Sequence, residues 1–350
     1  MVTFKAEELR SLTRAVFEAA GASRDEAGKV AELLVRSNLA GHDSHGVIRI
    51  PWYVTLIKEG KLKPGAKVEV IRETSSTALV DGNWGFGQVV AWRSMEIAVE
   101  KARISGVGTV GVYNCNHVGR LVDYTAFAAS QDMVGIMMCN DGAIVAPFGG
   151  IDRLFNPGPI SVAFPAGSQP PILLDISTAV AAEGKIRVKA RRGEKIPFGW
   201  IIDKEGRPTD NPADLYAGGA ILPLGGDVGY KGFGLGLFVD IMSGALTGSG
   251  CASSPEYKGG NGVFMMAVNI ANFTSVKDYK RRVDELILRV KASRKAPGVK
   301  EILLPGEPEL REEQRRLREG IYIEEETWKE IASTAKGLGL DLPLSATRDD

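Results

Sequence analysis

The chain has 350 residues, 44% of them hydrophobic, so it can bury a substantial core, and its length suggests about two domains. Its 43 basic side chains balance 43 acidic ones, which argues against a nucleic-acid or membrane surface built from clustered cations. Three scattered cysteines and only three histidines argue against a disulfide framework and against the usual zinc or multi-histidine metal sites. The sequence shows neither a signal-like apolar leader nor a run of about 20 apolar residues, so we expect a cytoplasmic protein.

The first 60 residues are predicted to be helical. Ser23 and Glu26 form a capping-box pattern ahead of a helix over residues 27–39. Pro51 fits the first turn of a further short helix, because proline is tolerated there and disrupts helix interiors. Residues 42–50 are therefore predicted to connect two helices.

From about residue 68 the pattern changes to short β-type runs that alternate with helices. Strands are predicted at residues 68–71, 77–81, 107–113, 133–139, 160–164, 172–176 and 263–273. Helices are predicted at residues 88–104, 121–130, 233–246, 276–294, 309–319 and 324–336, and the glycine- and proline-rich residues 197–229 are predicted to be irregular. We therefore predict a mixed α/β fold, with an α/β domain over residues 68–275 and a discontinuous helical domain from residues 1–67 and 276–350.

Two glycine-rich segments are candidates for phosphate binding. Gly106-Val-Gly108-Thr-Val-Gly111 matches GxGxxG, but a helix precedes it and a β-type run follows, which reverses the order that phosphate binding requires. We interpret it as a helix end and strand entry. The run from Lys231 to Gly236 precedes a predicted helix, so backbone N–H groups and one lysine could meet an anion there. Close packing of a glycine-rich helix explains the second segment equally well.

The connector from Gly41 to Pro51 concentrates groups that suit a small 2-oxo or 2-hydroxy acid. Arg49 offers the planar fork that matches a carboxylate. His45 has an ordinary pKa near neutrality, as proton transfer at the C2 oxygen requires. From these residues alone, a helix cap at Ser44 and a surface position for Arg49 remain equally possible.

Two further segments follow predicted strands, where loops commonly carry ligand-binding side chains. Asn114-Cys-Asn-His-Val-Gly119 places His117 directly after one strand, and Cys139-Asn-Asp-Gly142 places Asn140 after another. On these residues alone a lone histidine is more often structural, and Asn140 could simply start a turn with Asp141 and Gly142. Leu174-Asp-Ile-Ser-Thr-Ala179 ends a third strand, where we favour a helix cap.

These motifs together resemble the malate/L-lactate dehydrogenase family of the second, non-Rossmann type. That family includes sulfolactate, ureidoglycolate and 2,3-diketogulonate enzymes and cyclic-imine (ketimine) acid reductases. The matches run nearly from end to end: His42-Asp-Ser-His-Gly46 with Arg49 and Pro51, Asn116-His-Val-Gly119, Val145-Ala-Pro-Phe-Gly-Gly150, Asn156-Pro157, Gly184-Lys185, Ile196-Pro-Phe-Gly-Trp200, Gly229-Tyr-Lys-Gly-Phe-Gly-Leu235 and Leu304-Pro-Gly-Glu307.

The resemblance implies a cytoplasmic homodimer with a non-Rossmann NAD(P)-binding domain built on a mixed sheet, and a helical domain from both termini. It implies hydride transfer between NAD or NADP and C2 of a small 2-oxo or 2-hydroxy acid, without a metal. Among relatives both histidines have been assigned the proton transfer, and we rank His117 ahead of His45; Arg49 would hold the substrate carboxylate, with Ser44, Tyr53 and Asn140 nearby. The implied cofactor contacts are Asn140, Asp175, Ile176, Ser177, Lys231, Gly232, Gly306, Glu307 and Pro308.

One departure concerns the turn at residues 139–144, where many relatives have Thr-Asn-Ser and this chain has Cys-Asn-Asp-Gly. It leaves open the choice among 2-oxo acids, sulfonates and cyclic-imino acids. Two competing functions also stay open on the sequence: a hydrolase that uses Cys115 with His117, and a dinucleotide-sensing protein that has kept the fold.

Overall fold

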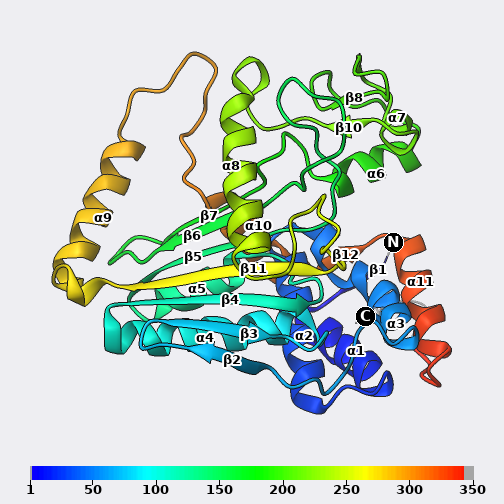
Figure 1. Ribbon diagram of the computed structural model, residues 1–350, viewed down its shortest axis with the longest axis horizontal. Helices are drawn as coiled ribbons and strands as arrows, with labels where there is room; N and C mark the ends of the chain where they lie inside the picture. The colour runs from blue at the N-terminus through cyan, green and yellow to red at the C-terminus, as the bar shows by residue number, and fades with distance from the viewer. Residues whose placement is uncertain (1, 343–350) are drawn as a thin grey trace.

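The computed structural model describes residues 2–342; residue 1 and residues 343–350, the end of the predicted helical domain, lie outside the described residues. Figure 1 shows a central sheet with helices on both faces, a group of helices from the two chain ends beside one end of the sheet, and a smaller lobe above it. The mixed α/β class predicted from the sequence is confirmed.

Within the described residues the central sheet has seven strands in the order β2-β3-β4-β11-β5-β6-β7. The β3–β4 pair is parallel, and the other neighbouring pairs are antiparallel. Since β4 and β5 both pair antiparallel with β11 between them, they run in the same direction and end at the same edge of the sheet. The strands are β2 (Glu69–Glu73), β3 (Thr77–Asp81), β4 (Val107–Cys115), β5 (Met133–Cys139), β6 (Ile160–Phe164), β7 (Ile172–Ile176) and β11 (Asn261–Asn269).

Helices cover both faces of this sheet (Figure 1). On one face α4 (Gly87–Ser105) and α5 (Val122–Ser130) bury small and branched apolar side chains against the strands. On the other face α8 (Tyr230–Asp240) packs Val239 against Met138 and Phe264. The predicted helix over residues 233–246 thus begins three residues earlier, and its last part, Ile241–Ala245, is a π-helical turn.

The two chain ends meet in one hydrophobic cluster. Strand β1 (Val2–Phe4) pairs antiparallel with β12 (Ile321–Ile323), and the rings of Phe4 and Trp328 lie 4.4 Å apart. The cluster includes residues of α1, α2, α3 and α11, while α10 packs on α2. The helices are α1 (Ala6–Ala19), α2 (Arg24–Leu39), α3 (Ile50–Lys58), α10 (Glu307–Glu319) and α11 (Glu325–Lys336).

Helix α9 (Val276–Lys291) lies at the opposite end of the sheet from this cluster (Figure 1). The division of the chain at residues 67 and 275 therefore stays a prediction.

The prediction of an irregular region at residues 197–229 is wrong in part. That region forms a small sheet of the order β10-β8-β9, with α6 before it, and both have their own apolar cluster. Strands of two residues leave no alternating pattern, which is why the sequence did not indicate them. The elements are α6 (Glu183–Arg191), β8 (Ile201–Ile202), β9 (Pro208–Thr209), α7 (Ala213–Tyr216) and β10 (Ala220–Ile221).

The GxGxxG match packs a helix on a strand, as its position predicted. Gly106 ends α4 in the left-handed conformation with φ 81°. A Cβ on Gly108 would lie 1.9 Å from the carbonyl oxygen of Ala98, so only glycine lets α4 approach β4 this closely. The segment is enclosed by its own helix and offers no open face to a phosphate.

Candidate active site

The connector between α2 and α3 consists of two short 3-10 turns, Asp43–His45 and Val47–Arg49, and Pro51 occupies the first turn of α3 as predicted. Asn38, buried at the end of α2, holds both turns: its Nδ2 donates to Asp43 at 2.7 Å, and its Oδ1 accepts from the backbone N–H of Val47 at 2.9 Å. Gly46 is required here, because a Cβ would lie 2.2 Å from Asn38 Oδ1. The connector is thus a fixed platform rather than a free loop.

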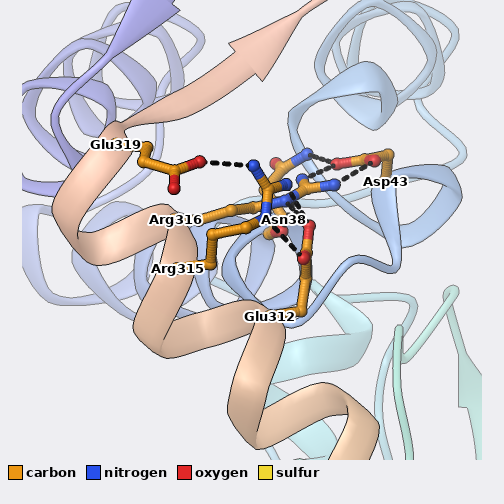
Figure 2. A network of polar contacts seen from close by, with 6 residues as sticks. All are labelled: Asn38, Asp43, Glu312, Arg315, Arg316 and Glu319. Atoms are coloured by element: carbon orange, nitrogen blue, oxygen red, sulfur yellow. Dashed lines mark hydrogen bonds and ion pairs between the residues drawn. The ribbon is translucent and has the colours of Figure 1, made fainter.

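The last turn of α10 fixes the same platform from the other chain end. Arg316 donates to Asp43 at 2.6 and 3.0 Å and to the carbonyl of Asn38 at 2.7 Å, while Glu312 accepts from its Nε at 2.5 Å. Figure 2 shows Arg316 reaching from α10 into the connector, with Arg315 bound to Glu312 and Glu319 behind it. Two segments about 270 residues apart in the chain therefore position one candidate site.

His45 and His117 come together although they lie in different parts of the chain. Their rings stack with centroids 5.3 Å apart, and Trp52 covers His117 edge-on at 5.7 Å. Tyr53 Oη lies 2.7 Å from Nδ1 of His117 and accepts a hydrogen bond of 2.7 Å from Gln88 Nε2. The Nδ1 atom of His45 is buried and has no hydrogen-bond partner among the described residues, which leaves it available to a ligand.

The environment keeps these histidines neutral. Burial, followed by the charge of Arg49, lowers the pKa of His45 from 6.5 to about 3. The same two causes lower the pKa of His117 well below its usual value. Burial raises the pKa of Tyr53 to about 12. At neutral pH the site therefore presents two neutral imidazoles and a neutral phenol beside one cation.

Arg49 is that cation. Its Nε donates to the carbonyl of Ser44 at 2.7 Å, and its guanidinium lies 5.2 Å from the ring centre of Trp52. Among the described residues, its two terminal nitrogens make no hydrogen bond or ion pair. Ser44 lies against the start of α6, since a Cβ on Gly184 would be 3.4 Å from Ser44 Cβ. Arg49 thus keeps its fork free for a carboxylate.

A pocket of about 410 Å³ lies next to this cluster, between the end of β7, the start of α5 and the start of α10. His42 lies in the pocket wall and links the pocket to the connector. Four of the predicted cofactor residues also line the pocket: Asp175, Ile176, Gly306 and Pro308. The volume lies within the usual range for small-molecule sites, about 300–1,000 Å³.

The pocket wall carries charged side chains, and of these Arg36, Arg120 and Asp123 were not indicated by the sequence. Arg120 is bound to Asp123 at 2.7 Å, and Arg36 lies 3.2 Å from the same carboxylate. Asp175 accepts from the backbone N–H of Val122 at 2.9 Å, and burial raises its pKa to about 6. Buried carboxylates and guanidinium groups in an otherwise apolar wall suit the hydroxyl and phosphate groups of a nucleotide.

Several predicted site residues lie elsewhere. Asn140 is fully buried, and its amide is satisfied: Nδ2 donates to Asp240 and Gly250, and Oδ1 accepts from Gly262. Its predicted contact with substrate or cofactor is therefore not supported, because no polar atom of the side chain is left to make it.

Four further residues predicted to contact the cofactor also lie outside the pocket wall. Ser177 binds the carbonyl of Pro157 and the N–H of Ala179 rather than capping a helix, and Glu307 binds Lys291 and the N–H of Leu304. Lys231 is exposed at the start of α8, and Gly232 packs on the backbone of Leu224. These four residues do not line the pocket, and close packing explains the glycine at position 232.

Cys115 is 1% exposed, and burial raises the pKa of its thiol. A thiolate nucleophile paired with His117 is therefore ruled out for this site.

Three positioning residues were not indicated by the sequence: Gln88 behind Tyr53, Arg316 behind Asp43, and Asn261 between the two strand-end loops. Asn261 Oδ1 accepts from the N–H of Val118 at 3.0 Å, and its Nδ2 donates to the carbonyl of Asn140 at 2.7 Å. The sequence around Arg316 and Asn261 carries no local signal of these roles, since one lies in a charged run and the other in a glycine-rich segment.

Comparison with known proteins decides the family. A family model described as malate/L-lactate dehydrogenase matches residues 4–332. The chain belongs to the malate/L-lactate dehydrogenase family. It is 40% identical over 342 residues to a malate dehydrogenase of Pyrococcus abyssi, which covers 95% of this chain and 94% of the relative.

Solved structures of the malate/L-lactate dehydrogenase family agree with the fold. A sulfolactate dehydrogenase from Methanocaldococcus jannaschii superposes with a TM-score of 0.88 at 36% identity, covering 97% of this chain and 98% of that one. A delta1-piperideine-2-carboxylate reductase from Pseudomonas syringae gives 0.84 at 27% identity, covering 95% and 100%. The chain is thus a hydroxy acid dehydrogenase by family, and the resemblance inferred from its motifs is confirmed.

Two observations bound this assignment within the described residues. Among residues 2–342 there is no group of three or more histidine, cysteine or acidic side chains that could hold a metal ion. None of the helices described in that range is both long enough and apolar enough to cross a membrane.

Proposed function

We propose that this protein transfers a hydride between a nicotinamide dinucleotide, NAD or NADP, and C2 of a small 2-oxo or 2-hydroxy acid. The observation that carries the proposal is the meeting of a free arginine fork with two half-buried neutral histidines beside a pocket of about 410 Å³. Positioning two small reactants in one cleft is itself a large part of such catalysis.

The pocket fits the proposed cofactor. Asp175 supplies a carboxylate for hydroxyl groups, Arg36 and Arg120 supply positive charge for phosphates, and Gly306 keeps the wall open where a side chain would intrude. When bound, the nicotinamide supplies the hydride to C2 of the substrate or accepts it from there.

Arg49 holds the substrate carboxylate in this mechanism. Its terminal nitrogens are free, and Nε is already fixed on Ser44, so the fork is oriented before substrate arrives. The unpartnered Nδ1 of His45 then lies available to a polar group of the substrate.

His117 transfers the proton. The Tyr53 oxygen accepts a hydrogen bond from the Gln88 N–H. The Tyr53 hydroxyl therefore donates to Nδ1 of His117, and the ring proton of His117 sits on Nε2. In the reductive direction the C2 oxygen takes the Nε2 proton while Nδ1 takes the proton of Tyr53. The imidazole stays neutral, which its lowered pKa favours, and the negative charge passes to the Tyr53 oxygen, where the Gln88 N–H and the charge of Arg49 offset part of the effect of burial until a proton returns.

The test is a panel of 2-oxo acids with each reduced cofactor, followed at the nicotinamide absorbance. His117→Asn should lower kcat about 10²–10⁴-fold and lose its limb of the pH profile, whereas His45→Asn should lower the rate and keep the profile's shape. Arg49→Lys should lower kcat/KM sharply with cofactor binding intact, and Arg72→Lys on the exposed strand β2 is the matched control. Wild-type profiles in His117→Asn and a lost limb in His45→Asn would exchange the two roles.

A cyclic-imine 2-carboxylate reductase is the second candidate. It is supported by the likeness to the Pseudomonas syringae reductase, and the same cluster could protonate an imine-derived nitrogen. Turnover of a cyclic-imino acid faster than of any 2-oxo acid in the panel would select this candidate.

The proposal includes a homodimer. Helix α8 and its π-helical turn expose an apolar strip of Leu235, Phe238, Ile241 and Leu246, between 41% and 60% accessible, which is typical of a covered interface. Phe238→Glu should shift the mass measured by light scattering from dimer to monomer; a monomeric wild type would contradict it. A cytoplasmic location also remains part of the proposal, supported by three scattered cysteines that form no disulfide.

A further inference from the structure

Asp141 lies at the same sheet edge as His117. Each follows one of the strands β4 and β5, which run in the same direction on either side of β11. Asn261 at the start of β11 binds the residue next to each of them, Val118 and Asn140. Two strand spacings separate the loops, which is roughly 10 Å, about the length of a small substrate with its contacts.

The carboxylate of Asp141 has no cation paired with it. Its Oδ1 accepts from the N–H of Gly142 at 2.7 Å and from Tyr257 Oη at 3.2 Å; Oδ2 has no partner within residues 2–342. Arg49 acts on its charge from a distance, without an ion pair. Asp141 is thus an acid held in place by hydrogen bonds, without an ion pair, close enough for the charge of Arg49 to act on it.

The other charges near Arg49 are already paired. Glu183 is bound by both Arg187 Nε and Arg187 Nη2 and accepts from Tyr216 Oη. Lys185 lies on the His42 side of the connector, where it helps to lower the pKa of that histidine. Arg49 is therefore the cation whose charge reaches Asp141, and one substrate carboxylate would occupy it.

We propose that Asp141 selects substrates by charge: it admits 2-oxo acids whose remaining part is neutral or positively charged and rejects those with a second anionic group. The inference rests on the proposed function and narrows its substrate class. It separates this chain from its relatives named for malate and sulfolactate, both of which carry a second acid group. A like charge placed opposite a substrate group is a common means of rejecting the wrong partner.

The experiment compares two substrates of equal chain length, 2-oxobutanoate and oxaloacetate, with sulfopyruvate as a second dianion. In the wild type, kcat/KM for 2-oxobutanoate should exceed that for oxaloacetate by at least about tenfold. Asp141→Asn keeps the acceptor atom for Tyr257 and should reduce this ratio by about tenfold, and Asp141→Ser should do the same. Asp152→Asn, on an exposed aspartate with no ion pair among the described residues, removes the same charge and should leave the ratio unchanged.

The outcomes are distinct. A wild type that prefers oxaloacetate or sulfopyruvate, or a ratio that neither Asp141 variant moves, would overturn the inference while the dehydrogenase stands. Turnover of no 2-oxo or cyclic-imino acid would overturn the proposed function and the inference with it. Melting curves show whether an Asp141 variant folds poorly. In that event the wild-type ratio of kcat/KM values still tests the inference.

Discussion

The glycine segment at residues 106–111 and the turn at residues 304–308 both place glycines beside the central sheet, yet only the second borders a pocket. At Gly108 the space of a Cβ is filled by the backbone of α4, with Ala98 O at 1.9 Å. At Gly306 it is filled by the side chain of Leu173, 2.8 Å away, on a wall that opens to the pocket. What lies where the Cβ would be therefore separates an architectural glycine from one at a ligand site, and the motif pattern does not.

Gly108→Ala should have the largest effect on stability. The new Cβ meets rigid helix backbone, so the free energy of unfolding should fall by about 3 kcal/mol. Cofactor affinity of the protein that remains folded should not change, because the segment does not line the pocket. Chemical denaturation and fluorescence titration with NADH and NADPH measure the two quantities. A selective loss of cofactor binding at unchanged stability would restore the phosphate-loop interpretation.

Gly306→Ala should lower both the stability of the protein and its affinity for the cofactor. Its φ of 93° costs an L-residue about 1–2 kcal/mol of stability. The new methyl group also pushes Leu173 toward the pocket, so cofactor affinity should weaken as well. The same two measurements apply, and a stability loss with full affinity would remove Gly306 from the pocket wall.

Asp175→Asn should lower cofactor affinity without lowering stability. Losing a charged acceptor for nucleotide hydroxyls should weaken cofactor binding about tenfold, or about 1.4 kcal/mol. The folded protein at pH 8 should melt at the same or a higher temperature, because burial of the charged carboxylate is unfavourable there. Equal losses in affinity and melting temperature would make Asp175 a structural residue.

A further effect is expected in the pH dependence of stability. The pKa of His45 is about 3 in the folded chain and 6.5 ordinarily, so between these values the unfolded chain binds more protons. Stability is therefore fully present above 6.5 and is lost as the pH falls toward 3; His45→Asn should lose less between pH 7 and 5. Asp175 has the opposite sign, since its folded pKa of about 6 exceeds the ordinary carboxyl value of about 3.9. Urea midpoints at several pH values for both variants check the two signs, and parallel curves would contradict them.

The sequence predicted the elements whose signals are local. The capping box at Ser23 and Glu26 is present, and the predicted strands at residues 77–81, 133–139, 160–164 and 172–176 have the observed bounds. Alternation and capping depend on neighbours in the chain, which is why they can be recognised without a structure. The pairing of β1 with β12 could not, because each partner is three residues long and lies about 320 residues from the other.

The candidate site shows the same contrast between local signals and contacts from distant parts of the chain. The histidines and Arg49 were indicated by residue type, whereas the hydrogen bonds that occupy the Asn140 amide go to Asp240, Gly250 and Gly262, each more than 90 residues away. An amide that could bind a ligand and one that closes a loop have identical sequence signatures. Only the partners distinguish them, and the fold supplies those.

The contact between β1 and β12 also sets when the site can form during synthesis. The apolar faces of α1 to α3 are completed by Ile321, Ile323 and Trp328, so the helices that carry the connector wait for residues near the other end of the described chain. Translation at about 5–20 residues per second delays that closure by roughly 15–65 seconds after the first helix emerges. Arg316, from the same late segment, then fixes the connector through its bonds to Asn38 and Asp43. In a nascent chain, Arg49, the proposed substrate-binding cation, is therefore held in position only after residues 316–328 have been made, later than the central sheet that supports it.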